Sequence, residues 1–277
     1  MTRLLAANFM RLGKSRYFRE CCVFMAVCGG FMVYAAYYSL CRYGYRSGLE
    51  DICFGYANLM GFVTAFFVSM FQGTEYSGGT IRNKLAVGHE RYQVYLAALI
   101  VNGAAVLLIN AVYVAVIFLF GIPTVGFFRM APAALLMLAF LTVLMDMAYA
   151  AVFTLLAMLN HNKASVTAVS ILGTLILMLV SGYIQSRLNE PKVYEAYEEV
   201  TDKGYVITRE AEENPYYLAG RKREICVVLN DLLPSGQGLQ IENRDTDRAG
   251  FLSLYACLTV VVCTGGGIAA FARKDIR

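Results

Sequence analysis

Charged side chains gather in one short stretch between long apolar runs. The stretch from Gln72 to Tyr95 reads QGTEYSGGTIRNKLAVGHERYQVY, and five charged residues fall within seventeen positions of it: Glu75, Arg82, Lys84, Glu90 and Arg91. At least twenty residues on each side carry no charged side chain. Long apolar flanks place such a stretch at a membrane surface, where it has the form that can receive force from a soluble partner.

Glycines divide this stretch into a short helix and its connections. The pair Gly78–Gly79 is expected to end the preceding helix, and Thr80 is placed to act as an N-cap. Ile81 and Leu85 lie four positions apart and therefore share one helix face, and Gly88 can end the helix. The pattern predicts a short helix outside the bilayer with an apolar ridge and a basic flank.

Asp146 is the one acidic or basic side chain deep within an apolar run. A carboxylate at that depth costs a few kcal/mol to insert, so such residues are usually paired or functional. A functional Asp146 would line a transport path or bind a proton. A structural Asp146 would accept a hydrogen bond from Asn102, Asn110 or Tyr113 and join two helices. Both interpretations remain open at this point.

The chain lacks the residue patterns of common catalytic and metal sites. His89 and His161 are the only histidines, and neither belongs to H-E-x-x-H or lies near a cysteine at ligand spacing. No G-x-S-x-G and no C-x-x-C occurs. The run Arg11–Ser15 ends like a phosphate-binding loop, but Asn8 stands where that loop requires glycine. We therefore expect no enzyme activity, no metal and no cofactor in this chain, and no basic stripe for nucleic acid.

Composition places the chain in a membrane. It is 58% hydrophobic and 16% charged over 277 residues, which is more apolar surface than one soluble core would bury. Since a helix needs about 20 apolar residues to cross the bilayer, six continuous runs qualify as helical spans: 21–41, 53–72, 93–119, 134–159, 165–186 and 250–272. Residues 1–19 are predicted to form an amphipathic interfacial helix with a basic polar side, or else a plain basic flank. The predicted fold class is an all-α integral membrane protein.

Basic residues indicate the orientation of the spans. With the amino terminus inside, the inner segments hold twelve Lys and Arg residues, whereas the two short outer loops hold three. This excess predicts that both termini and the short helix within 73–92 face the cytoplasm of a multi-pass plasma-membrane protein.

One longer polar segment, 187–249, separates spans 1–5 (within 1–186) from span 6 and the tail (250–277). It carries thirteen acidic and nine basic residues between Arg187 and Arg248. We expect a small external α+β cap with a helix over Lys192–Val200, a strand over Gly204–Thr208 and a helix over Arg221–Leu233 that Pro234 stops. So short a segment should pack on the outer mouth of the spans.

The eight cysteines do not form a disulfide framework. Most lie in apolar runs, where cysteine is an ordinary small buried residue. Cys41 and Cys53 lie at the outer ends of adjacent spans, and a disulfide between them is an open alternative in an oxidising exterior.

The charged stretch also resembles a known family. From Glu75 to Tyr95 it reads E-x-x-x-G-T-I-R-N-K-L-x-x-G-x-x-R-x-x-x-Y, which is similar to the coupling segment of the permease subunits of type-2 ABC exporters. The likeness extends to the six-span layout and to the ending F-x-R-K-D-I-R from Phe271 to Arg277. The resemblance implies two ATPase subunits that supply ATP and Mg, and a second permease subunit, identical or homologous.

The resemblance also implies roles for individual residues. Glu75 would lie at the start of the coupling segment, and Gly79 and Gly88 would set the ends of the coupling helix. Five residues would fit a groove on the ATPase: Thr80, Ile81, Arg82, Lys84 and Leu85. The implied cargo is an amphipathic substrate such as an antimicrobial peptide, a lantibiotic or a drug, with antibiotic resistance as one outcome. The competing interpretation is a self-sufficient secondary transporter or channel that uses Asp146.

Overall fold

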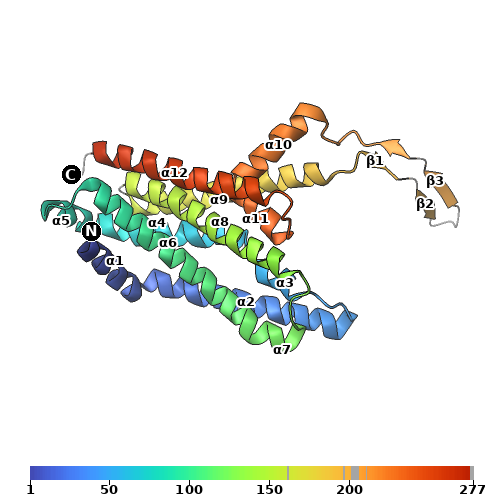
Figure 1. Ribbon diagram of the computed structural model, residues 1–277, viewed down its shortest axis with the longest axis horizontal. Helices are drawn as coiled ribbons and strands as arrows, with labels where there is room; N and C mark the ends of the chain where they lie inside the picture. The colour runs from blue at the N-terminus through green and yellow to red at the C-terminus, as the bar shows by residue number, and fades with distance from the viewer. Residues whose placement is uncertain (161, 196, 201–205, 210, 275–277) are drawn as a thin grey trace.

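Six long helices form the body of the protein. The computed structural model describes residues 1–160, 162–195, 197–200, 206–209 and 211–274. Within this part of the chain, six helices are long and apolar enough to cross a membrane, and they run along the long axis of the molecule (Figure 1). The elements in chain order are α1 (Thr2–Lys14), α2 (Arg16–Tyr43), α3 (Leu49–Phe54), α4 (Leu59–Ser77), α5 (Thr80–Ala86), α6 (Arg91–Val116), the π-helix η1 (Ile117–Gly121), α7 (Ile122–Val125), α8 (Pro132–Leu159), α9 (Lys163–Asn189), β1 (Val193–Tyr194), β2 (Tyr197–Val200), β3 (Val206–Arg209), β4 (Glu212–Glu213), α10 (Gly220–Leu232), α11 (Pro234–Glu242) and α12 (Ala249–Arg273).

The six predicted spans correspond to α2, α4, α6, α8, α9 and α12, so the all-α multi-pass membrane fold is confirmed at this level. The second span is preceded by a separate helix, α3, and the third continues through η1 into α7. These additions pack together, because a Cβ atom at Gly121 in η1 would lie 2.9 Å from Leu49 Cδ1 in α3. Glycine thus permits the close approach of α3 to the end of the third span.

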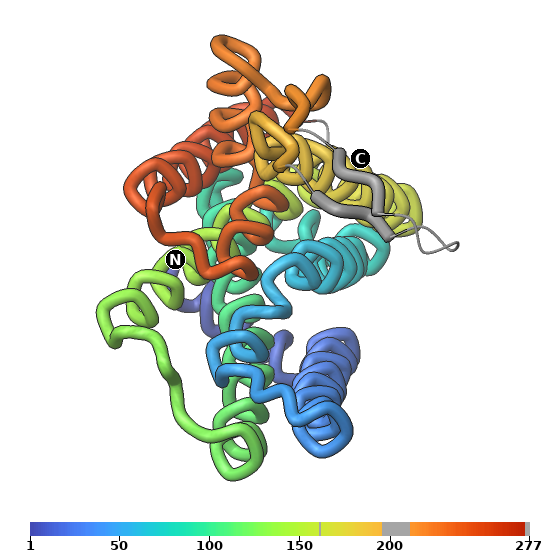
Figure 2. The backbone as a smooth tube through the Cα atoms, turned by 90° about the vertical axis from the view of Figure 1, so that its right-hand side faces the viewer, coloured from blue at the N-terminus to red at the C-terminus, as the bar shows by residue number. Residues whose placement is uncertain are grey.

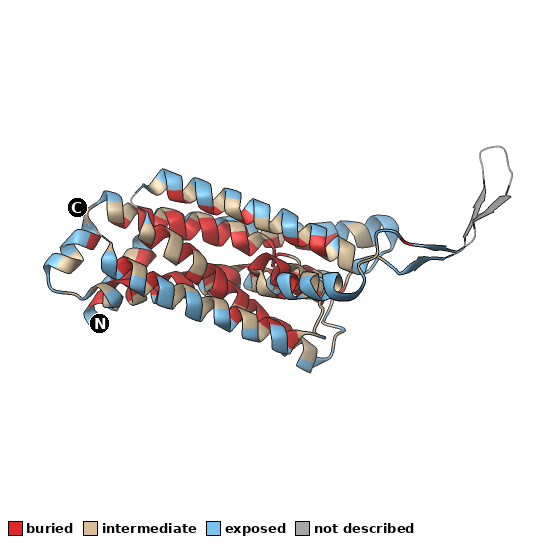
Figure 3. Cartoon of the chain, turned by 90° about the horizontal axis from the view of Figure 1, so that it is seen from above, coloured by how far each residue is buried: buried red, intermediate tan, exposed pale blue. Residues whose placement is uncertain are grey.

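The helix α4 occupies the centre of the bundle. In its most apolar stretch 78% of the residues are buried, compared with 28% in α2, 22% in α9 and 17% in α12. Seen end-on, α2 lies at the bottom of the bundle and α9 and α12 lie at the top (Figure 2). Burial is concentrated on the faces that meet inside (Figure 3). The outer faces expose large apolar side chains such as Phe31, Leu179 and Val261, as expected of helices that border lipid or another membrane subunit.

Polar side chains link the buried helix faces. Gln72 of α4 donates to Asn102 of α6 at 2.9 Å, and Asn102 donates to Thr154 of α8 at 2.9 Å. Ser69 of α4 donates to Ser170 of α9 at 3.1 Å. Hydrogen bonds of this kind between membrane helices contribute roughly 0.6 kcal/mol each. The main effect of these hydrogen bonds is to fix which helix faces meet.

Both chain termini and α5 lie at one end of the bundle, which we call the terminal end; α3, α7 and α10 lie towards the opposite, distal end (Figure 1). This arrangement is what an even number of spans produces. It places the charged stretch beside the amino-terminal helix and the end of α12, although these segments are far apart in sequence.

The segment 187–249 differs from its prediction in two respects. The helix expected over Lys192–Val200 is wrong: these residues contribute β1 and β2, which pair antiparallel with β4 and β3. The strand expected over Gly204–Thr208 coincides with β3 only from Val206, since Gly204 and Tyr205 lie outside the described residues. The strands extend beyond the distal end of the bundle (Figure 1).

Pro234 ends one helix and also begins another. It occupies the first turn of α11, where its missing N–H is not needed. Unlike a surface cap, α11 is largely buried and contacts α8, α9 and α10. Ser181 of α9 and Ser235 of α11 share a hydrogen bond of 2.7 Å.

All eight cysteines are free, with Cys41 exposed and Cys53 buried, so the alternative disulfide between them is not formed in this structure.

Candidate functional site

The glycines around α5 act largely as the sequence predicts. Gly78 caps the end of α4, and Gly88 follows α5 with φ of +94°. The N-cap of α5 is Gly79, with φ of +67°, and not Thr80. Thr80 is the first helical residue, and its hydroxyl donates to the Glu75 carbonyl at 3.0 Å. The left-handed conformation that this tight turn requires is one that glycine adopts without strain.

The apolar ridge of α5 faces the protein's own bundle. Ile81 is 1% exposed and belongs to a buried cluster with Leu4 of α1, Tyr95 of α6 and Phe271 of α12. Leu85 packs against the same cluster. Burial of one such side chain contributes roughly 1.5–3 kcal/mol. The side chain of Ile81 is therefore covered by this chain's own residues, and its contact with a partner's groove stays a prediction.

A buried carboxylate ties α5 to α1 and α4. Glu75 is 2% exposed, and it pairs with Lys84 of α5 and with Arg11 of α1, whose Nη1 lies 3.0 Å from Glu75 Oε1. Lys84 Nζ also donates to Asn8 Oδ1 at 2.8 Å. The Arg11 guanidinium lies 3.8 Å from the centre of the Phe71 ring. We call Asn8, Arg11, Glu75 and Lys84 the Glu75 cluster.

Charge balance explains how the Glu75 cluster is tolerated. Burial lowers the pKa of both the Lys84 ammonium and the Arg11 guanidinium, and the adjacent Glu75 carboxylate opposes that shift. The two cations therefore depend on the adjacent carboxylate as their counter-charge away from water. Lys84, expected on a docking face, is thus partly buried and paired within the chain, and its contact with a partner stays a prediction.

A second set of contacts joins the ends of α4, α6 and α8 to the end of α12. Arg91 Nη1 donates to the carbonyl of Phe271 at 3.1 Å and also to the carbonyl of Lys274. Lys274 Nζ donates to the Tyr76 hydroxyl at 3.0 Å and to the Met158 carbonyl at 2.9 Å. Burial lowers the pKa of Lys274 to about 8. The ends of α4, α6, α8 and α12 therefore meet around α5.

The solvent face of α5 is small and basic. Besides Thr80 and Gly88, four residues on this helix and the following turn are exposed: Arg82, Asn83, Ala86 and Val87. Val87 is 80% exposed. We call these four residues the exposed α5 face. An apolar side chain and a guanidinium on a rigidly supported helix form a surface that can bind another protein.

Sequence reasoning missed three contributors to this site: Asn8, Arg11 and Lys274. Asn8 carried a detectable signal, because it lies four residues from both Leu4 and Leu12 in the apolar stripe of α1, where an amide requires a partner. Arg11 and Lys274 could not be told from other basic flanking residues until α1 and α12 were placed beside α5.

Asp146 is fully buried at 0% exposed, and its Oδ2 accepts a hydrogen bond of 2.5 Å from Asn110 Nδ2. The Tyr56 hydroxyl in turn donates to Asn110 Oδ1. Asn102 bonds elsewhere, and Tyr113 donates to the Ile52 carbonyl at 2.7 Å. Among the three partners considered from sequence, Asn110 is the one that contacts Asp146, and this contact joins α6 to α8.

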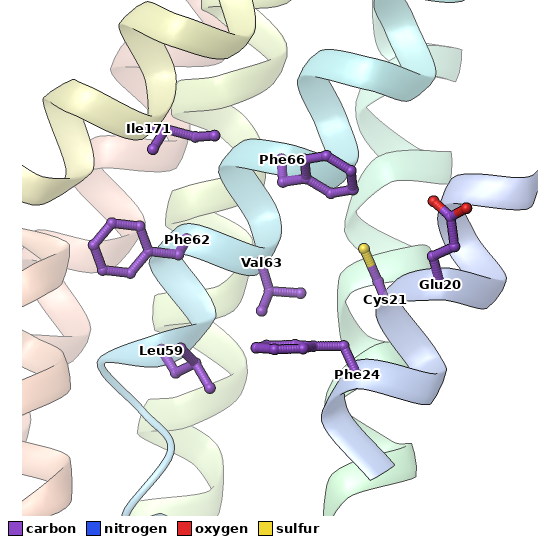
Figure 4. A pocket seen from close by; sticks show the side chains of 8 residues that line it. All are labelled: Glu20, Cys21, Phe24, Leu59, Phe62, Val63, Phe66 and Ile171. Carbon is purple, nitrogen blue, oxygen red and sulfur yellow. The ribbon is translucent and has the colours of Figure 1, made fainter. Parts of the chain in front are cut away.

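An apolar groove of about 360 Å³ lies between α2, α4 and α9. Cys21 and Phe24 of α2 face Val63 and Phe66 of α4 across it (Figure 4). Glu20 supplies the only charged side chain among the residues that line it. Over the described ranges, no cluster of three or more His, Cys, Asp or Glu residues has the geometry to hold a metal ion.

No protein-family model and no curated protein sequence matches this chain. The exposed α5 face, held by the Glu75 cluster and by the contacts at the end of α12, is consequently the feature on which a functional interpretation depends.

Proposed function

We propose that the chain is the membrane permease subunit of an ATP-driven ABC exporter, with both termini in the cytoplasm and the plasma membrane as its location. One observation carries the proposal: α5 protrudes between two spans at the terminal end, exposes a basic face, and is fastened from behind to the surrounding helices. A helix built in this way can receive a push from a soluble subunit and transmit it to the spans.

The mechanism divides α5 into two faces. The exposed α5 face, together with Thr80, would contact an ATPase subunit. Ile81, Lys84 and Leu85, assigned to that contact by the family resemblance, would instead anchor α5 to α1, α6 and α12. ATP-driven closure of two ATPase subunits would move α5, and the Glu75 cluster would carry the movement to α4 and α1. ATP and Mg would be held by the partner subunits, and a second permease copy or homologue would complete a dimer.

We propose an amphipathic cargo, such as an antimicrobial peptide, a lantibiotic or a drug. The groove between α2, α4 and α9 is lined mainly by aromatic and aliphatic side chains, with Glu20 at its edge. The segment 187–249 adds exposed aromatic surface at the distal end, including Tyr194 and Tyr216. If this segment sets selectivity, exchanging it for that of a related permease will change the resistance profile of the cells; an unchanged profile would contradict this assignment.

The test of the coupling proposal uses a charge reversal on the exposed α5 face. Arg82→Glu removes a surface guanidinium without touching the buried contacts of α5. Since interface arginines often contribute 2 kcal/mol or more, we expect at least about thirtyfold weaker ATPase binding and loss of transport. Arg46→Glu, at an exposed position near the distal end, is the matched control. Equal ATPase co-purification and transport in both variants would refute the proposal.

The alternative, a secondary transporter or channel that uses Asp146, predicts transport without an ATPase. The enclosed position of Asp146 and its bond to Asn110 favour a structural role. Flux that persists without any ATPase and disappears in Asp146→Asn would favour the alternative.

A further inference from the structure

A polar pocket of about 170 Å³ lies where the ends of α9, α10 and α11 meet the segment that leads into α12. Its lining includes Gln185, Arg223, Asn230, Asp231, Asp245 and Arg248. The lining is mostly polar, in contrast to the apolar groove in Figure 4. Most of these residues belong to the segment 187–249, but none of them was assigned a role in coupling or in cargo contact, so the inference does not rest on the proposed function.

Two of the charges in this pocket satisfy one another. Asp231 is 1% exposed, and its Oδ2 accepts from Arg248 Nε at 2.8 Å and from Nη2 at 2.6 Å. Gln240 donates to Asp231 Oδ1 at 3.1 Å. This two-point ion pair fixes α10 against the start of α12 and pairs the buried Asp231 carboxylate.

The remaining polar groups are only partly satisfied. Arg223 donates from Nη2 to the Leu188 carbonyl at 3.0 Å, but its buried Nη1 has no hydrogen-bond partner among the described residues. Asn230 is 2% exposed; its Nδ2 donates to Gln185 at 2.8 Å, and its Oδ1, which has no partner in the described chain, lies against Gly236 of α11. Asp245 accepts only from a nearby backbone N–H within its own turn, at 2.9 Å, and forms no ion pair over the described ranges.

These groups specify the chemistry of a ligand. A guanidinium donor binds a carboxylate, and a carboxylate binds an ammonium group. A simple anion would satisfy Arg223 but would meet Asp245 without a counter-charge, and a simple cation would have the reverse problem. The volume corresponds to roughly six water molecules, which restricts the ligand to a few heavy atoms.

We propose that this pocket binds a small zwitterion of the amino-acid class. Its carboxylate accepts from Arg223 Nη1, and its ammonium group donates to Asp245. The bound ligand joins α10 to the segment before α12, and it therefore stabilises the distal end of the protein.

The experiment measures the thermal unfolding midpoint of the purified full chain in detergent against increasing L-alanine. A saturating rise is expected. Glycine betaine at equal concentration is the control for general osmolyte stabilisation, because it has no N–H to donate. Acetate and ethylamine test each charge alone. No rise with L-alanine, or an equal rise with betaine, acetate or ethylamine, overturns the proposal.

Matched variants locate the effect. Arg223→Gln and Asp245→Asn should each weaken the apparent affinity for L-alanine about tenfold or more, while Arg223→Lys retains part of it. Arg221→Gln and Asp247→Asn change exposed neighbours and should match the unmodified protein. If Arg223→Gln does not fold, Arg223→Lys and Asp245→Asn decide the question. Unchanged affinity in the pocket variants that fold contradicts the assignment.

Discussion

Replacing Glu75 with glutamine should release α1 from α5 while leaving the spans folded. The carboxylate is 2% exposed and faces Arg11 and Lys84, whose side chains are 28% and 16% exposed. Glutamine keeps the size of the side chain but leaves two partly buried cations beside each other without a counter-charge. Breaking a buried ion pair in this way costs about 3–5 kcal/mol, and the partial exposure of Arg11 favours the lower end of that range.

Amide hydrogen exchange measured by mass spectrometry reads this out locally. A loss of about 3 kcal/mol corresponds to roughly 150-fold faster exchange through local opening. We expect that acceleration in α1 and α5, with little change in α8. Glu90→Gln neutralises an exposed carboxylate on the same surface and serves as the control. Unchanged protection of α1 in Glu75→Gln would refute the reasoning.

A double-mutant cycle separates the pair from its surroundings. Glu75→Gln together with Lys84→Gln removes a cation as well as the carboxylate, so less uncompensated charge remains. The double variant should therefore lose less stability than the sum of the two single losses, with an interaction energy of about 0.5–3 kcal/mol. Strict additivity would show that Glu75 and Lys84 are not coupled.

Three further outcomes are expected. Gly267→Ala should destabilise the protein by about 1–3 kcal/mol in thermal unfolding, because its Cβ would overlap the Tyr95 hydroxyl, whereas Gly265→Ala meets nothing within 4 Å and should be neutral; equal effects would contradict this packing. Lys274, whose pKa burial lowers to about 8 from 10.5, should show a midpoint near pH 8 in residue-resolved acylation. Since its folded pKa lies below the unfolded value, the charged ammonium destabilises the folded state. This destabilisation should be constant below pH 8 and should disappear as the pH rises towards 10.5; a midpoint near 10.5 would contradict the burial of Lys274. Asp146→Asn keeps a hydrogen-bonding side chain, so it should cost about 1 kcal/mol or less, measured by the unfolding midpoint, and a much larger loss would indicate that the charge itself is needed.

Local patterns predicted the spans and the existence of α5 because both are encoded by neighbouring residues. A continuous apolar run determines a span, and Gly79 and Gly88 allow the turns that bound α5. The direction in which α5 faces was not predictable in the same way. Ile81 is buried by residues of α1 and α12, which are distant in sequence, so the same apolar ridge could equally have faced a partner.

Non-local pairing also explains the error at Lys192–Val200. Its apolar residues fit a helical spacing, but Val193 and Tyr194 pair with Glu212 and Glu213 across a hairpin. Strand pairing of this kind depends on residues beyond the local window, and it overrides weak helical periodicity. Pro234 was correctly recognised as a helix terminator, but its equal suitability for starting α11 was not considered.

The most direct measurement of the central claim is site-specific photo-crosslinking from the exposed α5 face in cells. A photoreactive residue at Val87, which is 80% exposed, is expected to form an adduct with a soluble protein that contains a complete phosphate-binding loop and hydrolyses ATP. The same residue at Tyr45, exposed towards the distal end, should form no such adduct. An ATPase adduct from Val87 alone is the predicted result; no ATPase adduct from Val87, or an equal one from Tyr45, would contradict the account.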